Sequence, residues 1–137
     1  MTKEELVYSK NQKYSQIQTN KANLSSVDTQ LSDVQSAKEK IKEHKDSAKE
    51  IYNTFKKLPY NDKSNWKGTN RNNFKECNFQ RSKEDFEHYI DGLDDMLDAL
   101  VDKEKKLIDE KNDYCIIIEQ LNDAWNWLTG QIEKLVN

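Results

Sequence analysis

Proline and glycine, which most often interrupt secondary structure, are scarce here: the 137 residues include one proline and three glycines. Cysteine occurs twice, too seldom for a disulfide framework. No stretch approaches the roughly 18 apolar residues of a membrane span, so no membrane insertion is expected. Residues 1–6 lack the apolar core of a secretory signal peptide. We therefore expect a cytoplasmic protein, or one exported without a cleaved signal.

Hydrophobic residues are also few. They make up 34% of the chain, against roughly 45–50% in ordinary globular domains, and charged residues make up another 34%. This composition suits either a disordered chain or long solvated helices with a narrow apolar seam. The net charge of −3 is nearly balanced. The lysine run at residues 38–45 is interleaved with acids and lacks aromatics that stack on bases, so no nucleic-acid partner is expected.

Heptad spacing of apolar residues favours long helices over a disordered chain. Apolar residues recur at alternate steps of three and four from Leu6 to Phe55. A capping box at residues 2–5 is predicted to begin this helix, and Pro59 to end it. A longer stripe with a seven-residue period follows: Phe79, Phe86, Leu93, Leu100, Leu107, Tyr114, Leu121, Leu128 and Leu135. The sequence predicts one all-α domain, with helices at about 3–58 and 70–135 and a turn at about 59–69.

A short connection makes two helices antiparallel neighbours. Placing the reversal near residue 64 predicts that Ile41 faces Phe86 and that Ala48 faces Phe79. In this register the last ten residues or so of the second helix have no partner, and exposed apolar surface usually marks a protein contact. We expect a coiled-coil-like hairpin that completes a four-helix bundle with a partner. The predicted partner-binding residues are Trp125, Trp127, Leu128, Ile132 and Leu135.

Catalytic and metal-binding patterns are missing from the sequence. His44 and His88 lie in charged helical stretches, and neither has a cysteine or second histidine at metal-ligand spacing. No glycine-rich phosphate loop or nucleophile elbow is present. We expect a protein that is not an enzyme and has no cofactor. Cys77 and Cys115 are predicted to lie ~57 Å apart on one helix, too far for a disulfide, and are interpreted as small side chains flanking the seam.

Five aspartates form an acidic stripe at helical spacing. Its members are Asp91, Asp94, Asp95, Asp98 and Asp102. One interpretation is a solvated helix face. The other is a docking strip for a basic surface, because complementary charge steers association. A calcium site is not expected, because helical carboxylates without a loop rarely surround a cation.

The predicted turn contains the triplet Trp66-Lys67-Gly68. In a helical hairpin without a signal peptide, this triplet resembles the small Trp-X-Gly proteins of bacterial type VII secretion. The chain length and the central triplet look more like the accessory helical proteins associated with LXG-type toxins of Gram-positive bacteria. The resemblance implies binding to the toxin's helical N-terminal region, or to a second small helical protein, to promote export. The alternative is an ordinary turn in which Trp66 caps the core and Gly68 relieves a tight φ.

The sequence departs from the family in its export signal, which is an aromatic residue followed four positions later by Asp or Glu. No aromatic residue here has an acid at that position. The resemblance therefore implies an escort, or targeting chaperone, that borrows its signal from a partner. The alternative function is a self-associating coiled-coil scaffold or spacer, and we expect the chain to self-associate when it is expressed alone.

Overall fold

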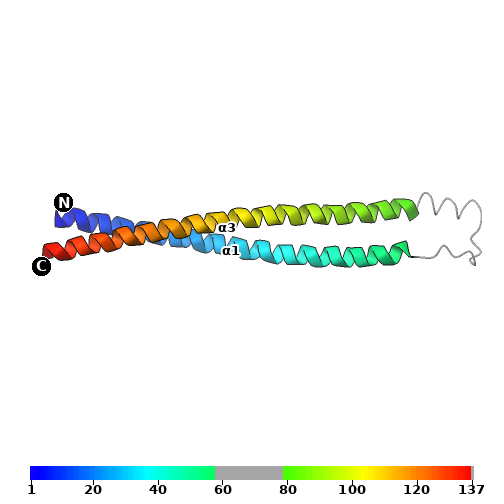
Figure 1. The fold of residues 1–137 in the computed structure, drawn as a ribbon, viewed down its shortest axis with the longest axis horizontal. Coiled ribbons are helices and arrows are strands. Elements are labelled where there is room, and N and C mark those ends of the chain that lie inside the picture. The colour runs from blue at the N-terminus through cyan, green and yellow to red at the C-terminus, as the bar shows by residue number, and fades with distance from the viewer. Residues whose placement is uncertain (58–78, 137) are drawn as a thin grey trace, which may run out of the picture. The chain divides into compact units, whose positions relative to one another are not determined.

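The computed structural model of the chain describes residues 1–57 and 79–136. Two long helices make up these residues: α1 spans Lys3–Lys56 and α3 spans Gln80–Val136 (Figure 1). No strand occurs in the two described ranges, and α1 and α3 pack against each other as a hairpin. The predicted all-α hairpin is therefore confirmed. Residue 58, the predicted turn at 59–69 and the predicted helix start at 70 lie outside the described residues.

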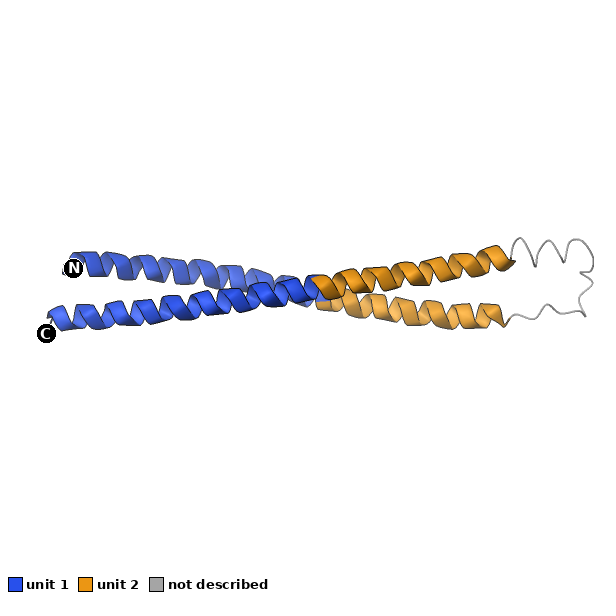
Figure 2. Ribbon diagram, turned by 45° about the horizontal axis from the view of Figure 1, so that its top comes forward, with its two compact units in different colours: residues 1–34, 103–137 blue, residues 35–102 orange. Residues whose placement is uncertain are grey.

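The hairpin divides into two compact units (Figure 2). Unit 1 combines residues 1–34 with residues 103–137, and unit 2 consists of residues 35–102. Within each unit, a segment of α1 lies beside an antiparallel segment of α3. Each unit thus has its own row of interhelical side chains.

The predicted capping box is present at the start of α1. The Thr2 hydroxyl accepts a hydrogen bond from the Glu5 amide at 3.2 Å, and the Glu5 carboxylate accepts one from the Thr2 amide at 3.3 Å. The first turn of a helix leaves amides without intrahelical acceptors, and these two bonds satisfy one such donor and the amide that precedes it. Local sequence thus determines where α1 begins.

The predicted heptad stripes form the seam, the row of side chains where α1 and α3 meet in each unit. The buried seam residues of unit 1 are Leu6, Ile17, Val27, Leu107 and Leu128, and those of unit 2 are Ala48, Tyr52, Ile90 and Leu93. The other stripe residues in the described ranges are half-buried, except Leu135, which is 55% exposed. Gly92 and Gly130 lie within α3, as the uninterrupted stripe predicted.

The predicted register between the helices is wrong. In unit 2, the Phe79 ring stacks on Phe55 with centroids 4.8 Å apart, whereas the prediction placed Phe79 opposite Ala48. The Lys45 ammonium forms an ion pair with Asp94. Each residue of α3 therefore meets α1 one to two heptads closer to the C-terminal end of α1 than predicted.

Unit 1 has the same offset. Its seam contains an ion pair between the Lys111 ammonium and the Asp28 carboxylate at 2.9 Å. The prediction failed because it centred the reversal on turn-forming residues near 64. A seven-residue apolar repeat offers similar packing in every register shifted by seven, so it cannot correct an error of this kind.

Candidate protein-binding surfaces

The predicted overhang at the end of α3 does not exist. In unit 1 the Leu128 side chain is only 5% exposed, and Ile132 is half-buried. The Lys10 ammonium of α1 lies 4.5 Å from the centre of the half-buried Trp125 ring. These three predicted partner-binding residues pack within the hairpin, because the true register gives them neighbours on α1. Trp127 and Leu135 are exposed and remain candidates for a protein contact.

Apolar side chains outside the seam are numerous. The described residues contain nine buried hydrophobic side chains and thirteen large hydrophobic side chains that are exposed. In unit 1 the exposed ones are Met1, Val7, Tyr8, Tyr14, Ile108, Ile116, Ile117, Trp127, Leu135 and Val136. This surplus of exposed apolar side chains becomes a candidate protein contact where the side chains lie next to one another, because scattered ones are normal on folded proteins.

In unit 2 the exposed apolar side chains gather on one face. They are Ile51, Tyr89 and Met96, at exposed fractions of 57%, 56% and 51%. Three shallow hollows open beside them, and the one that spans both helices is lined by Ala37, Lys40, Ile41, His44, Met96, Ala99 and Leu100. We call this surface the groove face and define it by Ala37, His44 and Ile51 of α1 and Tyr89, Met96 and Ala99 of α3.

Heptad geometry explains the groove face. Ala37, His44 and Ile51 are seven residues apart on α1, and Tyr89 and Met96 are seven apart on α3. In an antiparallel pair, the positions that flank one side of the seam on both helices meet on the same face. The chain places small or apolar side chains at most of these positions, so a groove follows directly from the repeat.

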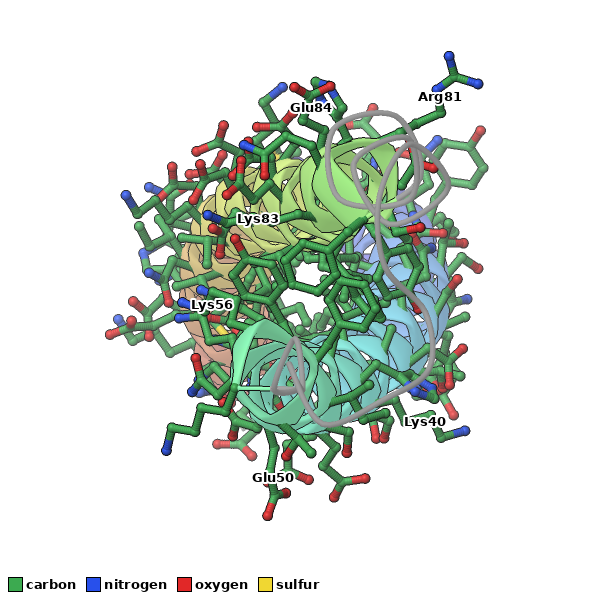
Figure 3. The ribbon with its side chains drawn as sticks, turned by 90° about the vertical axis from the view of Figure 1, so that its right-hand side faces the viewer. Lys40, Glu50, Lys56, Arg81, Lys83 and Glu84 are labelled. Atoms are coloured by element: carbon green, nitrogen blue, oxygen red, sulfur yellow. The ribbon has the colours of Figure 1, made fainter. Side chains whose placement is uncertain are left out.

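The opposite side of unit 2 is polar, and we call it the lysine face. A hollow there is lined by Lys49, Tyr52, Asn53, Lys56, Glu87, Ile90 and Asp91. The Tyr52 hydroxyl donates a hydrogen bond to the Glu87 carboxylate. Figure 3 looks along the helices and shows Lys56 on one side of unit 2 and Lys40, which lines the groove, on the other. One face of unit 2 thus carries polar contacts across the seam, and the other carries its large exposed apolar side chains.

The polar contacts of unit 2 shift two pKa values. The hydrogen bond to Glu87, together with desolvation and the charge of Glu87, raises the pKa of Tyr52 from 10.0 to about 12. The hydrogen bond to Asp94 raises the pKa of Lys45 above 10.5. A group whose pKa is raised by folding stabilises the fold below its unfolded-state pKa and loses this contribution as the pH rises through its folded-state pKa. Both contributions therefore disappear in alkaline solution.

Alkaline unfolding provides a test. We expect the free energy of unfolding, followed by urea denaturation, to fall between pH 10 and pH 12. Tyr52→Phe should flatten this decrease, because the variant has no phenol to ionise, whereas Tyr8→Phe on an exposed site should leave it unchanged. Glu87→Gln should lower the pKa of Tyr52 toward 10, which is measured by tyrosinate absorbance. Identical pH profiles for the parent and Tyr52→Phe would contradict the assignment.

The acidic stripe does not act as one surface. Asp94 is half-buried and belongs to the ion pair with Lys45, so it is not part of an open docking strip. Asp91 lines the hollow of the lysine face. Asp95, Asp98 and Asp102 are exposed. The stripe thus combines one interhelical partner with four carboxylates exposed to solvent.

The remaining residues singled out in the sequence are the histidines, the cysteines and the turn motif. His44 and His88 are both exposed, as predicted, and Cys115 is an exposed free thiol. Within residues 1–57 and 79–136, no group of three or more His, Cys, Asp or Glu residues could hold a metal ion. Cys77 and the turn motif residues Trp66 and Gly68 lie outside the described residues.

The fold and its surfaces define an all-α helical hairpin with heptad packing. The chain has no significant match among protein-family models, curated proteins or solved structures. Neither α1 nor α3 contains a segment apolar enough to cross a membrane.

Proposed function

We propose that the chain is a non-enzymatic accessory protein of bacterial type VII secretion. It binds the helical N-terminal region of an LXG-type toxin, a second small helical protein, or both, and targets the toxin for export. It acts in the cytoplasm and leaves the cell, if at all, without a cleaved signal peptide. The seam then becomes part of a four-helix bundle.

The surplus of exposed apolar side chains carries this proposal. Burying one large apolar side chain contributes roughly 1.5–3 kcal/mol, and the described residues expose thirteen of them. Nine hydrophobic side chains are buried in these residues. A second helical protein that covers part of the exposed surface would bury further apolar side chains.

The resemblance of Trp66-Lys67-Gly68 to the Trp-X-Gly proteins directs the proposal to type VII secretion. Because no aromatic residue is followed by an acid four positions later, the chain is proposed as an escort. The toxin or the second helical protein supplies the export signal. Among the predicted partner-binding residues, Trp127 and Leu135 are the ones available to it.

Co-expression tests this function. The chain, produced with the helical N-terminal region of an LXG-type toxin, should give a complex of defined mass by size exclusion with light scattering. Trp127→Gln should weaken the complex without lowering helicity, because Trp127 is 58% exposed and removing its ring disturbs no seam contact. Gln120→Ala, an exposed change one heptad earlier on α3, is the matched control. A soluble monomer that forms no complex would exclude the escort function.

A scaffold or spacer is the second candidate. It is favoured by the seam, which places apolar residues at heptad spacing in both units. This function requires the chain to associate with itself in defined assemblies in the absence of any toxin. Light scattering of the chain alone separates the two functions, because an escort needs no regular self-assembly.

A further inference from the structure

We infer that the groove face of unit 2 binds an amphipathic helix whose apolar stripe is flanked on both sides by lysine or arginine. This inference rests on the proposed function only for the source of the helix. The floor of the groove consists of Ile41 and Leu100 from the seam, with Met96 and the small residues Ala37 and Ala99 beside them. The small side chains allow a third backbone to approach, because they add little bulk above the seam.

The dimensions of the groove match a helix. The hollow at Met96 is followed, toward the C-terminal end of α1, by a second hollow on α1, lined by Ser47, Glu50, Ile51, Thr54 and Phe55, and by a third on α3, lined by Ser82, Asp85, Phe86 and Tyr89. On α1 the surface runs from Ala37 to Phe55, which is about 19 residues or ~28 Å at the rise of a helix. A ligand helix of about five turns, with apolar residues at steps of three and four, fits this length.

Charge determines which helix fits. The outward surface of α3 between residues 84 and 102 is exposed and contains no lysine or arginine. Its carboxylates in the groove or between the two faces are Asp85, Asp95 and Asp102, whereas Asp91 lines the lysine face and Glu84 and Asp98 lie in heptad register with it. Asp85 lines the hollow on α3 and Glu50 lines the hollow on α1, so each wall contributes an acid to the groove. Lys40 is the one lysine that lines the hollows of this face.

Three other lysines of unit 2 lie away from the hollows of the groove face. Lys45 pairs with Asp94 across the seam, and Lys49 and Lys56 line the hollow of the lysine face. Figure 3 shows Glu50 and Glu84 projecting outward from α1 and α3. An incoming helix with basic flanks therefore places its charges against unpaired carboxylates and its apolar stripe against the floor.

The same charges disfavour a second copy of this chain as the occupant. Two groove faces packed together would bring the acidic outer surface of one α3 close to the acids of the other copy. Like charges held close together destabilise an interface. A basic amphipathic helix meets no such repulsion, so it is the occupant that both the floor and the walls support.

A designed peptide tests the inference without any toxin. A labelled peptide of about 19 residues carries leucine at heptad spacing and lysine at the flanking positions, and a second peptide replaces these lysines with glutamate. Fluorescence anisotropy with the full chain should show at least tenfold tighter binding of the lysine peptide. Equal binding of the two peptides would overturn the charge assignment.

Two substitutions locate the site. Ile51→Gln with Met96→Gln removes exposed apolar area on the groove face. This double variant should bind the lysine peptide at least tenfold more weakly. The matched control is Ile108→Gln with Ile116→Gln, which changes two exposed isoleucines of unit 1 and should leave affinity unchanged. An equal loss for both pairs, or no loss for the first, would overturn the site. Circular dichroism confirms that each variant keeps its helicity.

A further pair of double variants tests the acids that line the groove. Glu50→Gln with Asp85→Asn should weaken binding of the lysine peptide about threefold to tenfold. It should also reduce the salt dependence of this binding, because both acids line the groove. Glu39→Gln with Asp98→Asn removes the same charge at positions in heptad register with Asn53 and Asp91 of the lysine face, and should have a smaller effect. If the two double variants weakened binding equally, the peptide would be held by general charge attraction and not by the groove, and the inference would be overturned.

Failure of this inference can be separated from failure of the proposed function. If the toxin complex forms and is unchanged by Ile51→Gln with Met96→Gln, the groove is not the site but the escort function stands. If the lysine peptide binds in the groove and no toxin complex forms, the groove stands and the escort function fails. If the chain alone is a dimer that this double variant dissociates, the occupant is a second copy and the inference is wrong.

Discussion

Leu107→Ala is expected to lower the free energy of unfolding by about 2–5 kcal/mol, the range for truncating a fully buried leucine. The Leu107 side chain is 1% exposed, the lowest value among the described core residues. It lies in the seam of unit 1, where only two helices contribute packing. Such a seam has few neighbouring side chains that can move in to fill the cavity. Urea denaturation followed by circular dichroism measures the loss.

The adjacent residue is the control for this experiment. Ile108 is 40% exposed, so Ile108→Ala removes a similar amount of apolar side chain from a site that is partly in water. Its expected effect is below about 1 kcal/mol. Measurements at several protein concentrations separate hairpin stability from self-association. Similar losses for the two variants would mean that Leu107 is not in the core of the folded protein.

Phe86→Ala is expected to cost about 3 kcal/mol, near the lower end for removing a phenylalanine ring, because Phe86 is half-buried. Its ring centroid lies 5.2 Å from that of Phe55 and 5.8 Å from that of Tyr52. Phe86 also packs against the buried cluster of Ala48, Tyr52, Ile90 and Leu93. The variant therefore removes two aromatic contacts and opens the core of unit 2.

Tyr89→Ala is the matched control on the same helix. Tyr89 is 56% exposed on the groove face and contributes little to the seam, so the variant should change stability by no more than about 0.5 kcal/mol. Thermal unfolding by circular dichroism compares the two variants. Equal destabilisation by Tyr89→Ala and Phe86→Ala would mean that Tyr89 packs in the seam, which would contradict its place on the groove face.

Local features of the fold could be predicted from the sequence. The capping box at Thr2 and Glu5 needs only residues three apart, and the hydrogen bonds confirm it. The seam positions follow from helical periodicity, because apolar residues recur at heptad spacing between Leu6 and Ile132. A pattern repeated this often tolerates polar members such as Asn20 and Lys111.

The register could not be predicted in the same way. Shifting one helix by seven residues keeps every apolar residue in the seam, so the stripes alone do not distinguish the alternatives. The distinguishing signal is in the polar seam residues. Lys45 reaches Asp94 and Lys111 reaches Asp28 only in the observed alignment. Matching these seam lysines with acids on the opposite helix would have corrected the prediction.

The candidate surfaces depended on the register. Because the alignment was wrong, Leu128 was predicted as an exposed contact although it is buried. The groove face was not predicted, because the two stripes do not include the positions beside them. Ala37, Ile51, Tyr89 and Met96 share one flank of the repeat, and this pattern is visible in the sequence once the helices are known to be antiparallel.

The aromatic contacts of unit 2 also bear on the order in which the chain assembles. Tyr52 and Glu87 are 35 positions apart in the sequence, and Phe55 and Phe79 are closer still. Lys10 and Trp125 are separated by most of the chain. Each doubling of the closed loop adds about 0.6 kcal/mol of entropic cost. Ring packing at Phe55 and Phe79 therefore offers the least costly nucleus, from which later contacts close progressively longer loops, as in a zipper.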